Sequence, residues 1–403
     1  MIWLCVALIV VSFGVSLPAT ALVRRMGLRL GTLDGAGVAG QVKAPARRVP
    51  NTGGVGIFAG IALPMLAGLA FIWCCVDHQT LIGMSDWLEP LHEHFVGIRQ
   101  RTGDAVVLLA ALLLLHVMGL FDDRRPLGAY PKLAIMLAAA AGVAWLTDSR
   151  MLTLLDSHVG GPWLSFTLTV LWIGVVTNAF NFLDNMDGLS AGVAAIASAF
   201  FLAGTLASPQ PQWFVAACLA LLIGSLLGFL VFNFPLRKPA TIFMGDGGSL
   251  VVGFLLAILT VRTTYVAGAA TGADPAAVSL ASHSLSPLFM PLVVLAIPLY
   301  DFCSVTVIRL RQGKSPFVGD LQHFSHRLVQ RGLSKRSAVL VIYGCTAVTA
   351  IGGVSLPRLL GWQAALVGVQ TLLVLSVLAL YEWSSTRPQA DPSESQRAHG
   401  GAP

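Results

Sequence analysis

The chain alternates between long apolar stretches and short polar connections, and this pattern predicts the type of element. About eleven stretches approach the roughly 20 apolar residues that a helix needs to cross the hydrocarbon of a bilayer. They centre on residues 2–22, 54–76, 104–121, 131–147, 163–183, 189–207, 213–234, 249–266, 287–308, 337–355 and 361–382. We therefore expect an all-α, polytopic integral membrane protein, with one transmembrane domain over residues 1–384 and a disordered cytoplasmic tail over 385–403.

Composition supports this prediction. Hydrophobic residues make up 56% of the chain and charged residues only 11%, and the mean hydropathy is +0.78, which no ordinary soluble domain approaches. The first stretch ends at Ala19-Thr20-Ala21, which is similar to a signal-peptidase site. However, no basic residue precedes it, and Arg24 and Arg25 follow directly, so we interpret it as a retained helix.

Basic residues predict the orientation of the chain. Alternate connections carry 20 of the 25 Lys and Arg residues, and the others carry only five. Because cytoplasmic loops are enriched in Lys and Arg, the first set is placed in the cytoplasm, with the N-terminus outside and the C-terminus inside. The net charge of +6 is then explained by topology and by attraction to the lipid bilayer. No pattern indicates binding to nucleic acid.

Four polar segments lie at the predicted cytoplasmic helix ends. They are "FDDRRPLGAYPKL" (121–133), "NAFNFLDNMDGLSAG" (178–192), "FMGDGGS" (243–249) and "GDLQHFSHRL" (319–328). One acid at a helix end commonly forms an interfacial salt bridge. Four polar segments on one face of a membrane protein instead indicate a shared functional site.

The predicted helix directions place four acids at or just beyond helix C-termini: Asp122, Asp123, Asp184 and Asp187. The helix dipole disfavours a negative charge there by about 0.3 to 1 kcal/mol. A cation should compensate, and Mg²⁺ is suited because it takes carboxylate oxygens and substrate phosphates together; Mn²⁺ is an alternative. Lys132 is expected to contribute a further positive charge.

The segment "FMGDGGS" differs because it precedes a helix. Its glycines allow close approach of the backbone, and free N–H groups at a helix N-terminus attract phosphate. Asp246 would repel a phosphate there unless a metal bridged them, so Asp246 is our leading metal ligand. A simple helix N-cap is the alternative interpretation.

Further polar residues could hold a diphosphate or a sugar. Asn178, Asn181 and Asp184 follow one another at intervals of three and share a broad helical face. His323, His326 and Arg327 lie in a basic loop. Zinc binding would require more ligands than this loop offers, so phosphate or sugar contact is preferred over zinc, with a solvated loop as the alternative.

Taken together and in this order, the four segments resemble the polyprenyl-phosphate N-acetylhexosamine-1-phosphate transferases, also called glycosyltransferase family 4. The resemblance spans roughly residues 1–382. The matching positions are the pair Asp122-Asp123, Lys132-Leu133, the "NxxNxxDGxDGL" pattern from Asn178 to Leu189, "FMGD" at Phe243 to Asp246, the late loop from Asp320 to Leu328, and Pro50, Gly53 and Gly54 before the second helix. The chain departs from the family pattern at Asn185, where glycine is usual, and at Ser325, where a histidine is usual.

The resemblance implies a Mg²⁺-dependent enzyme in the cytoplasmic membrane of a bacterium. The donor would be a UDP-N-acetylhexosamine, the acceptor undecaprenyl phosphate and the by-product UMP, with a possible homodimer as the assembly. The implied roles are Asp122 as base or covalent nucleophile, Asp123 as support for the metal or the substrate, and Asp246 as metal ligand. The substrate-binding residues would be Lys132, Asn178, Asn181, Asp184, Asp187, Phe243, His323, His326 and Arg327, with Phe243 stacking on uracil.

Other functions fit less well. Within the family, the muramoyl-pentapeptide branch carries a longer histidine run in the late loop, so "HFSHRL" favours an N-acetylglucosamine donor. CDP-alcohol phosphotransferases continue from Asp-Gly with an arginine and further aspartates, which "LSAGVAAIAS" after Gly188 lacks. A transporter should carry its acids near the middle of the membrane within broken helices, whereas here nearly all acids lie at one surface.

Overall fold

The computed structural model describes residues 1–33, 47–75, 101–208, 212–235, 237–269, 286–316 and 321–384. These residues are almost entirely helical and form no β-sheet; one isolated bridge pairs Leu33 with Pro50. Ten helices of the described part are long and apolar enough to cross a membrane. The prediction of an all-α, polytopic membrane protein is confirmed. The orientation of the termini stays a prediction, and the expected tail at 385–403 lies outside the described residues.

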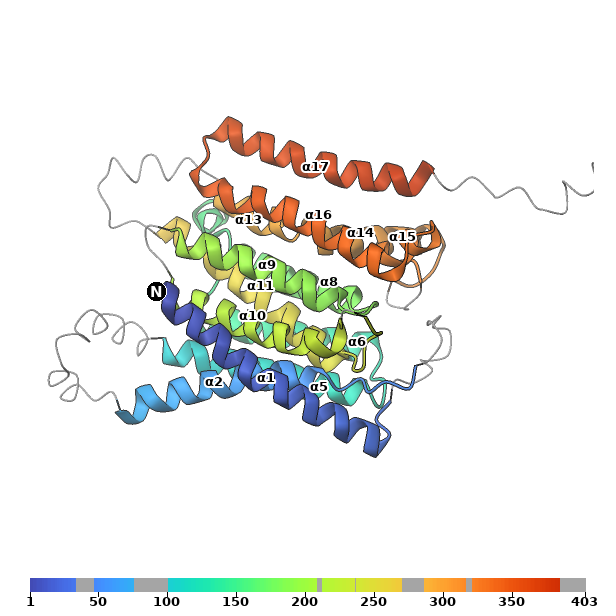
Figure 1. Cartoon of the computed structure of the whole chain (residues 1–403). Helices are drawn as coiled ribbons and strands as arrows, with labels where there is room; N and C mark the ends of the chain where they lie inside the picture. The colour runs from blue at the N-terminus through green and yellow to red at the C-terminus, as the bar shows by residue number, and fades with distance from the viewer. Residues whose placement is uncertain are drawn as a thin grey trace, which may run out of the picture.

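The long helices lie side by side and run back and forth along one direction (Figure 1). The ten candidate spans lie in α1 (Ile2–Leu30), α2 (Gly54–Cys75), α5 (Thr102–Asp122), α6 (Ala129–Leu146), α8 (Trp163–Leu183), α9 (Leu189–Leu206), α10 (Trp213–Asn233), α11 (Asp246–Ala269), α16 (Lys335–Ser355) and α17 (Gly361–Ser384). Shorter helices are α7 (Asp156–Val159), α13 (Ser286–Val294), α14 (Ala296–Arg311) and α15 (Phe324–Gln330), with 3₁₀ turns at Thr153–Leu155 and Leu356–Arg358.

The predicted span at 287–308 is the main difference from expectation. It is divided into α13 and α14, which meet at Leu295. Pro298 explains the division, because it lacks the N–H that a continuous helix would donate to Val294 and its ring would clash with that carbonyl. In the first turn of α14 the same proline is tolerated, since no N–H is needed there.

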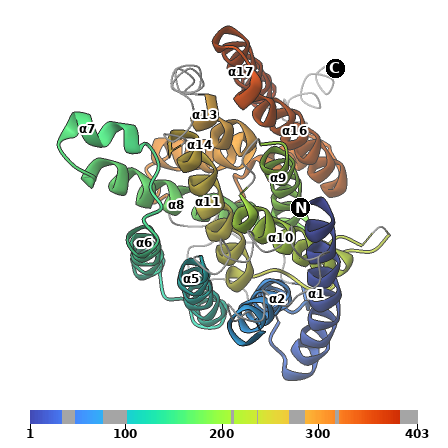
Figure 2. The same ribbon diagram turned by 90° about the vertical axis from the view of Figure 1, so that its left-hand side faces the viewer.

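Helix α11 occupies the centre of the bundle, with α2, α5, α8, α9 and α10 around it (Figure 2). Its most apolar 18-residue window is 83% buried, whereas the corresponding window of α17 at the periphery is 11% buried. The N-terminus of α11 is Asp246. An acidic residue, Asp246, therefore lies at one end of the most buried of the ten candidate spans.

Small side chains let α1, α2 and α10 approach one another closely. The Ser12 hydroxyl lies 2.6 Å from the Leu221 carbonyl oxygen and 2.8 Å from that of Gly60. Ser225 on α10 donates to the Ile57 carbonyl at 2.9 Å. Small and hydroxylated residues are typical of helix contacts in membranes, where packing and hydrogen bonds hold helices together.

The closest backbone approach joins α5 to the start of α11. A Cβ atom at Gly119 would lie 2.4 Å from the Gly247 nitrogen and 2.5 Å from the Asp246 carbonyl carbon. On the other side, a Cβ at Gly54 would lie 2.3 Å from the Gly248 nitrogen. Backbone and not flexible side chain occupies these positions, so no larger residue fits without moving Asp246.

Substituting Gly119 with alanine tests this contact. We expect Gly119→Ala to cost about 1 to 3 kcal/mol through overpacking and to abolish most activity, because Asp246 would be displaced. Gly103→Ala on the same helix is the matched control, since nothing lies within 4 Å of its Cβ position. Thermal unfolding in detergent would check both variants, and equal midpoints for the two would contradict the close approach.

Candidate active site

Lys132 lies among the oxygens of three predicted site residues. Its ammonium nitrogen contacts Asp246 Oδ2 directly and lies 3.4 Å from Asp122 Oδ2 and 3.5 Å from Asn181 Oδ1. Asn181 in turn donates from Nδ2 to Asp246 Oδ1 at 2.8 Å and to Ser249 Oγ at 2.9 Å. The structure thus brings together residues from α5, α6, α8 and α11 that the sequence placed in one site.

Asp122 also shapes the turn between α5 and α6. Its Oδ1 accepts a hydrogen bond from the Leu127 N–H at 2.7 Å, while Oδ2 faces Lys132. One carboxylate oxygen thus fixes the turn that delivers α6, and the other remains at the cation.

Asp123 caps the start of α11. Its oxygens accept hydrogen bonds from the Asp246 N–H at 3.0 Å and the Gly247 N–H at 3.4 Å. The expectation that free N–H groups at this N-terminus await a phosphate is therefore wrong for these two, because a carboxylate of the protein already binds them. The positive end of α11 compensates the acid that the C-terminus of α5 disfavours.

Asp184 lies close to Gly245, which precedes Asp246 in this turn, because the Gly245 N–H favours the ionised Asp184 carboxylate and lowers its pKa against the effect of burial. Gly245 has φ of +70°, and a Cβ there would lie 2.3 Å from the Asn51 carbonyl oxygen and 2.5 Å from Asp123 Oδ2. Only glycine combines this left-handed conformation with such a close approach. The "FMGDGG" turn is thereby held between the ends of α5 and α8.

The acids of this cluster repel one another. Burial, followed by the charge of Asp246, raises the pKa of Asp123 to about 7. Burial likewise raises the pKa of Asp184, and the charges of Asp246 and Asp123 raise it further. Among the residues that the structure describes, Lys132 is the cation that contacts this cluster, and its single charge does not balance the carboxylates of Asp122, Asp123, Asp184 and Asp246.

This donor set fits a divalent cation that arrives with a substrate. No three His, Cys, Asp or Glu side chains of the described residues already form a metal-binding group. Mg²⁺ commonly takes only one or two carboxylates and completes its shell with water and substrate phosphates. A cluster with excess negative charge beside partly exposed Asp246 suits that mode of binding better than a closed cage of protein ligands.

Asp187 and Phe243 are tied together by Arg47. The Arg47 Nη1 lies 3.0 Å from both carboxylate oxygens of Asp187, and the guanidinium carbon lies 5.0 Å from the centre of the Phe243 ring. Asp187 also accepts from the Ala240 N–H at 2.9 Å. Arg47 covers one face of Phe243, and Asp187 anchors a loop. The sequence did not predict a role for Arg47 in the site, because its only local signal is that it lies in a basic stretch.

Asn178 is not brought into the cluster. Its Nδ2 donates to the Gly174 carbonyl at 2.8 Å, one turn back on α8. The spacing predicted that Asn178 and Asn181 share a helical face, but only Asn181 contacts Asp246.

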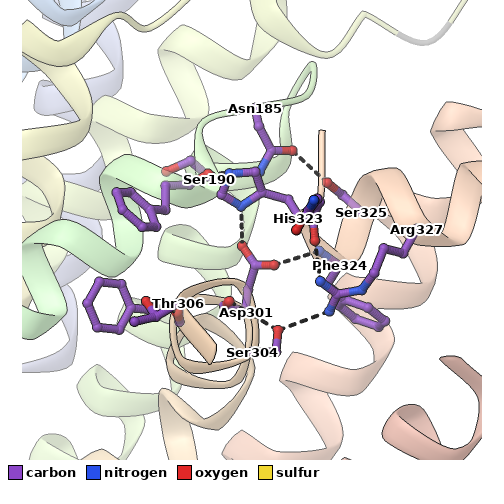
Figure 3. A network of polar contacts seen from close by, with 12 residues as sticks. Asn185, Ser190, Asp301, Ser304, Thr306, His323, Phe324, Ser325 and Arg327 are labelled. Carbon is purple, nitrogen blue, oxygen red and sulfur yellow. Dashed lines mark hydrogen bonds and ion pairs between the residues drawn. The ribbon is translucent and has the colours of Figure 1, made fainter. Parts of the chain in front are cut away.

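The late loop is held by two acids that sequence analysis missed. Asp301 on α14 lies 2.9 Å from His323 Nδ1, and Glu382 on α17 lies 2.9 Å from Arg327 Nη2 (Figure 3 shows the Asp301 contacts). Each acid interrupts an apolar stretch, "PLYDFCSV" in the case of Asp301. Acids in such positions need partners, so this signal was present in the sequence.

The loop also contacts the segment that carries Asp184. The His323 ring meets the Phe182 ring edge to face, with 5.8 Å between centroids, and lies 6.5 Å from the His326 ring. Ser325 Oγ donates to Asn185 Oδ1 at 2.5 Å. The two positions that depart from the family pattern are therefore in direct contact, and the late loop lies beside the carboxylate segment.

Comparisons with known proteins agree with the resemblance. Residues 105–264 match the family described as Glycosyl transferase family 4. The chain is 28% identical over 92% of its length, and 91% of the relative's, to a Bacillus subtilis protein named probable undecaprenyl-phosphate N-acetylglucosaminyl 1-phosphate transferase. It is 34% identical over 72% of its length, and 73% of the relative's, to the Mycobacterium leprae decaprenyl-phosphate N-acetylglucosaminephosphotransferase. An Escherichia coli K12 protein named undecaprenyl-phosphate alpha-N-acetylglucosaminyl 1-phosphate transferase is 26% identical over 83% of this chain and 78% of its own.

Asp184→Asn should separate stability from function. A raised pKa means that the ionised carboxylate is less favourable in the folded protein than in the unfolded chain. Removing the charge at neutral pH should therefore leave the thermal midpoint unchanged or higher, while activity falls at least tenfold. A lower midpoint with retained activity would show that Asp184 is structural.

Asp187→Asn is expected to lower the stability and to leave donor binding intact, the reverse of Asp184→Asn. Asp187 and Arg47 are 27% and 34% exposed, so weakening their ion pair and the hydrogen bond to Ala240 should cost about 1 kcal/mol. The midpoint should fall while the KM for the donor stays within about twofold. A raised donor KM at normal stability would instead identify Asp187 as a substrate contact.

Proposed function

Because the chain belongs to glycosyl transferase family 4, we propose that this membrane transferase moves N-acetylglucosamine 1-phosphate from UDP-N-acetylglucosamine to undecaprenyl phosphate. The observation that carries the proposal is the gathering of Asp122, Asn181 and Asp246 around Lys132. Such a site handles phosphates at the end of a membrane-spanning bundle, where a water-soluble diphosphate and a lipid phosphate can meet. UMP is the leaving product, and the product lipid starts a cell-envelope glycan.

The names of the relatives support the choice of donor. The three described above are named for N-acetylglucosaminyl transfer, two to undecaprenyl phosphate and one to decaprenyl phosphate. This favours UDP-N-acetylglucosamine over the muramoyl-pentapeptide donor. Undecaprenyl phosphate is the proposed acceptor.

The bonds that change define what the residues must do. An oxygen of the lipid phosphate attacks the phosphorus next to the sugar, the bond from that phosphorus to the bridging oxygen breaks, and UMP leaves with the bridging oxygen. Both reactants are anionic, so their repulsion must be lowered before they approach. Lys132 supplies a fixed positive charge for this purpose.

The remaining residues take roles that follow from their contacts. Asp122 Oδ2, beside Lys132, is placed to take a proton from the lipid phosphate or to attack phosphorus itself. Asn181 fixes the orientation of the Asp246 carboxylate. Asp246 would hold Mg²⁺, with Asp184 as a neighbouring carboxylate; when bound, Mg²⁺ neutralises diphosphate charge and stabilises the charge that develops on UMP.

We place the active site at the cytoplasmic face of a bacterial inner membrane. The support is the distribution of basic residues, 20 of 25 of which lie in alternate connections on one side. UDP-sugars are soluble donors, so the site must face the compartment that contains them.

Release of UMP tests the function directly. Purified protein in detergent, given undecaprenyl phosphate and UDP-N-acetylglucosamine, should release UMP with Mg²⁺ or Mn²⁺, and EDTA should abolish release. Asp246→Ala should lower the rate at least about 100-fold, in line with the loss of a charge-stabilising group. Asp148→Asn is the control, because that side chain is 72% exposed and pairs only with Arg150 among the described residues. Activity that persists in EDTA would exclude the metal, and silence with every UDP-sugar would exclude the function.

A further inference from the structure

We propose that Asp301 is a positioning residue that fixes the proton and the orientation of the His323 imidazole beside the segment that carries Asp184. The inference rests on the proposed function for its kinetic consequence. The pairing itself rests on the contacts of Asp301, which lies on α14 and belongs to none of the four polar segments seen in the sequence.

Asp301 is a fully buried carboxylate on α14. The residue is 0% exposed. Burying a carboxylate is costly unless hydrogen bonds satisfy its oxygens, and acids in membrane helices are accordingly rare and functional. Both oxygens of Asp301 are indeed satisfied, and both partners come from the late loop.

The first oxygen sets the backbone of the late loop. Oδ1 accepts from the Phe324 N–H at 2.6 Å. Phe324 is the first residue of α15 and His323 is its N-cap. An N–H in the first turn of a helix has no partner within that helix. The Asp301 carboxylate satisfies this N–H, so Asp301 holds the first residue of α15.

The second oxygen sets the ring of His323. Oδ2 lies 2.9 Å from His323 Nδ1 (Figure 3). An ionised carboxylate only accepts hydrogen bonds, so Nδ1 must carry a proton and donate it. Among the described residues Nε2 makes no hydrogen bond. It is also not among the fully enclosed polar atoms without a partner, so a ligand can reach it. The pairing therefore reserves Nε2 for a ligand.

A second contact of the His323 ring is aromatic. Phe182 meets it edge to face, and the Arg309 guanidinium stacks over Phe182 at 5.3 Å. The hydrogen bond from Ser325 to Asn185 joins the same loop to the same segment. Phe182 and Asn185 flank Asp184 in sequence, so the fixed imidazole stands beside the carboxylate segment.

A double-mutant cycle tests whether Asp301 acts through His323. Asp301→Asn preserves shape and can still accept from Phe324, but its amide N–H₂ would then face Nδ1 and move the ring proton to Nε2. We expect Asp301→Asn and His323→Gln each to lower kcat/KM for UMP release about 10- to 100-fold. The double variant should lie within about threefold of His323→Gln alone, because residues that act as a unit are not additive.

Asp148→Asn should leave kcat/KM unchanged. Multiplying effects in the double variant would show that Asp301 acts independently of His323. An Asp301→Asn variant that folds normally and retains wild-type kcat/KM would overturn the proposal.

Nitrogen NMR of ¹⁵N-histidine-labelled wild-type protein makes the pairing testable even if Asp301→Asn does not fold. The signals lost in His323→Gln identify the ring. We expect Nδ1 to be protonated, and a bare Nδ1 with a proton only on Nε2 would overturn the proposal. This readout does not depend on substrate, so a protein that releases no UMP would refute the proposed function while the NMR result still decides the role of Asp301.

Discussion

The structure depends on holding several carboxylates together at one end of an apolar bundle. Lys132 offsets two of them, Asp122 and Asp246, by direct contact. The positive end of α11 offsets Asp123 through two backbone N–H groups. A partly buried cluster of like charges is tolerated only with such compensation. The cluster nevertheless keeps excess negative charge, which suits a site that receives a cation together with a phosphorylated substrate.

Packing makes this electrostatic arrangement possible. Helix α11 is the most enclosed element, and backbone atoms around Asp246 and Gly247 lie against Gly119 on one side, while Gly54 packs against Gly248 on the other. Only glycine fits at these positions, so α11 packs closely against α5 and α2. This packing places Asp246, at the start of α11, in contact with Lys132 and Asn181. The same glycines that allow close helix packing therefore also set the geometry of the chemical site.

Much of this architecture was predictable from sequence, because long apolar stretches and polar helix ends carry strong local signals. Asp122, Lys132, Asn181 and Asp246 were assigned to one site, and they meet. Spacing alone did not show that Asn178 would bond to its own helix, or that Asp123 would occupy the N–H groups expected to bind phosphate. Arg47 was missed because its importance arises from contacts with residues distant in sequence, whereas Asp301 and Glu382 were missed although each interrupts an apolar stretch. The break between α13 and α14 depends on Pro298, which the hydropathy of the predicted span at 287–308 did not reveal.

The most direct test of the central claim is whether the carboxylate cluster itself binds a divalent cation. Electron paramagnetic resonance of Mn²⁺ titrated into detergent-purified protein, with UDP-N-acetylglucosamine present, would measure this without any turnover. The account predicts one bound Mn²⁺ per chain in the wild-type protein and in Asp148→Asn, and loss of that ion in Asp246→Asn. Equal Mn²⁺ binding by wild type and Asp246→Asn, or no bound Mn²⁺ in either, would contradict it.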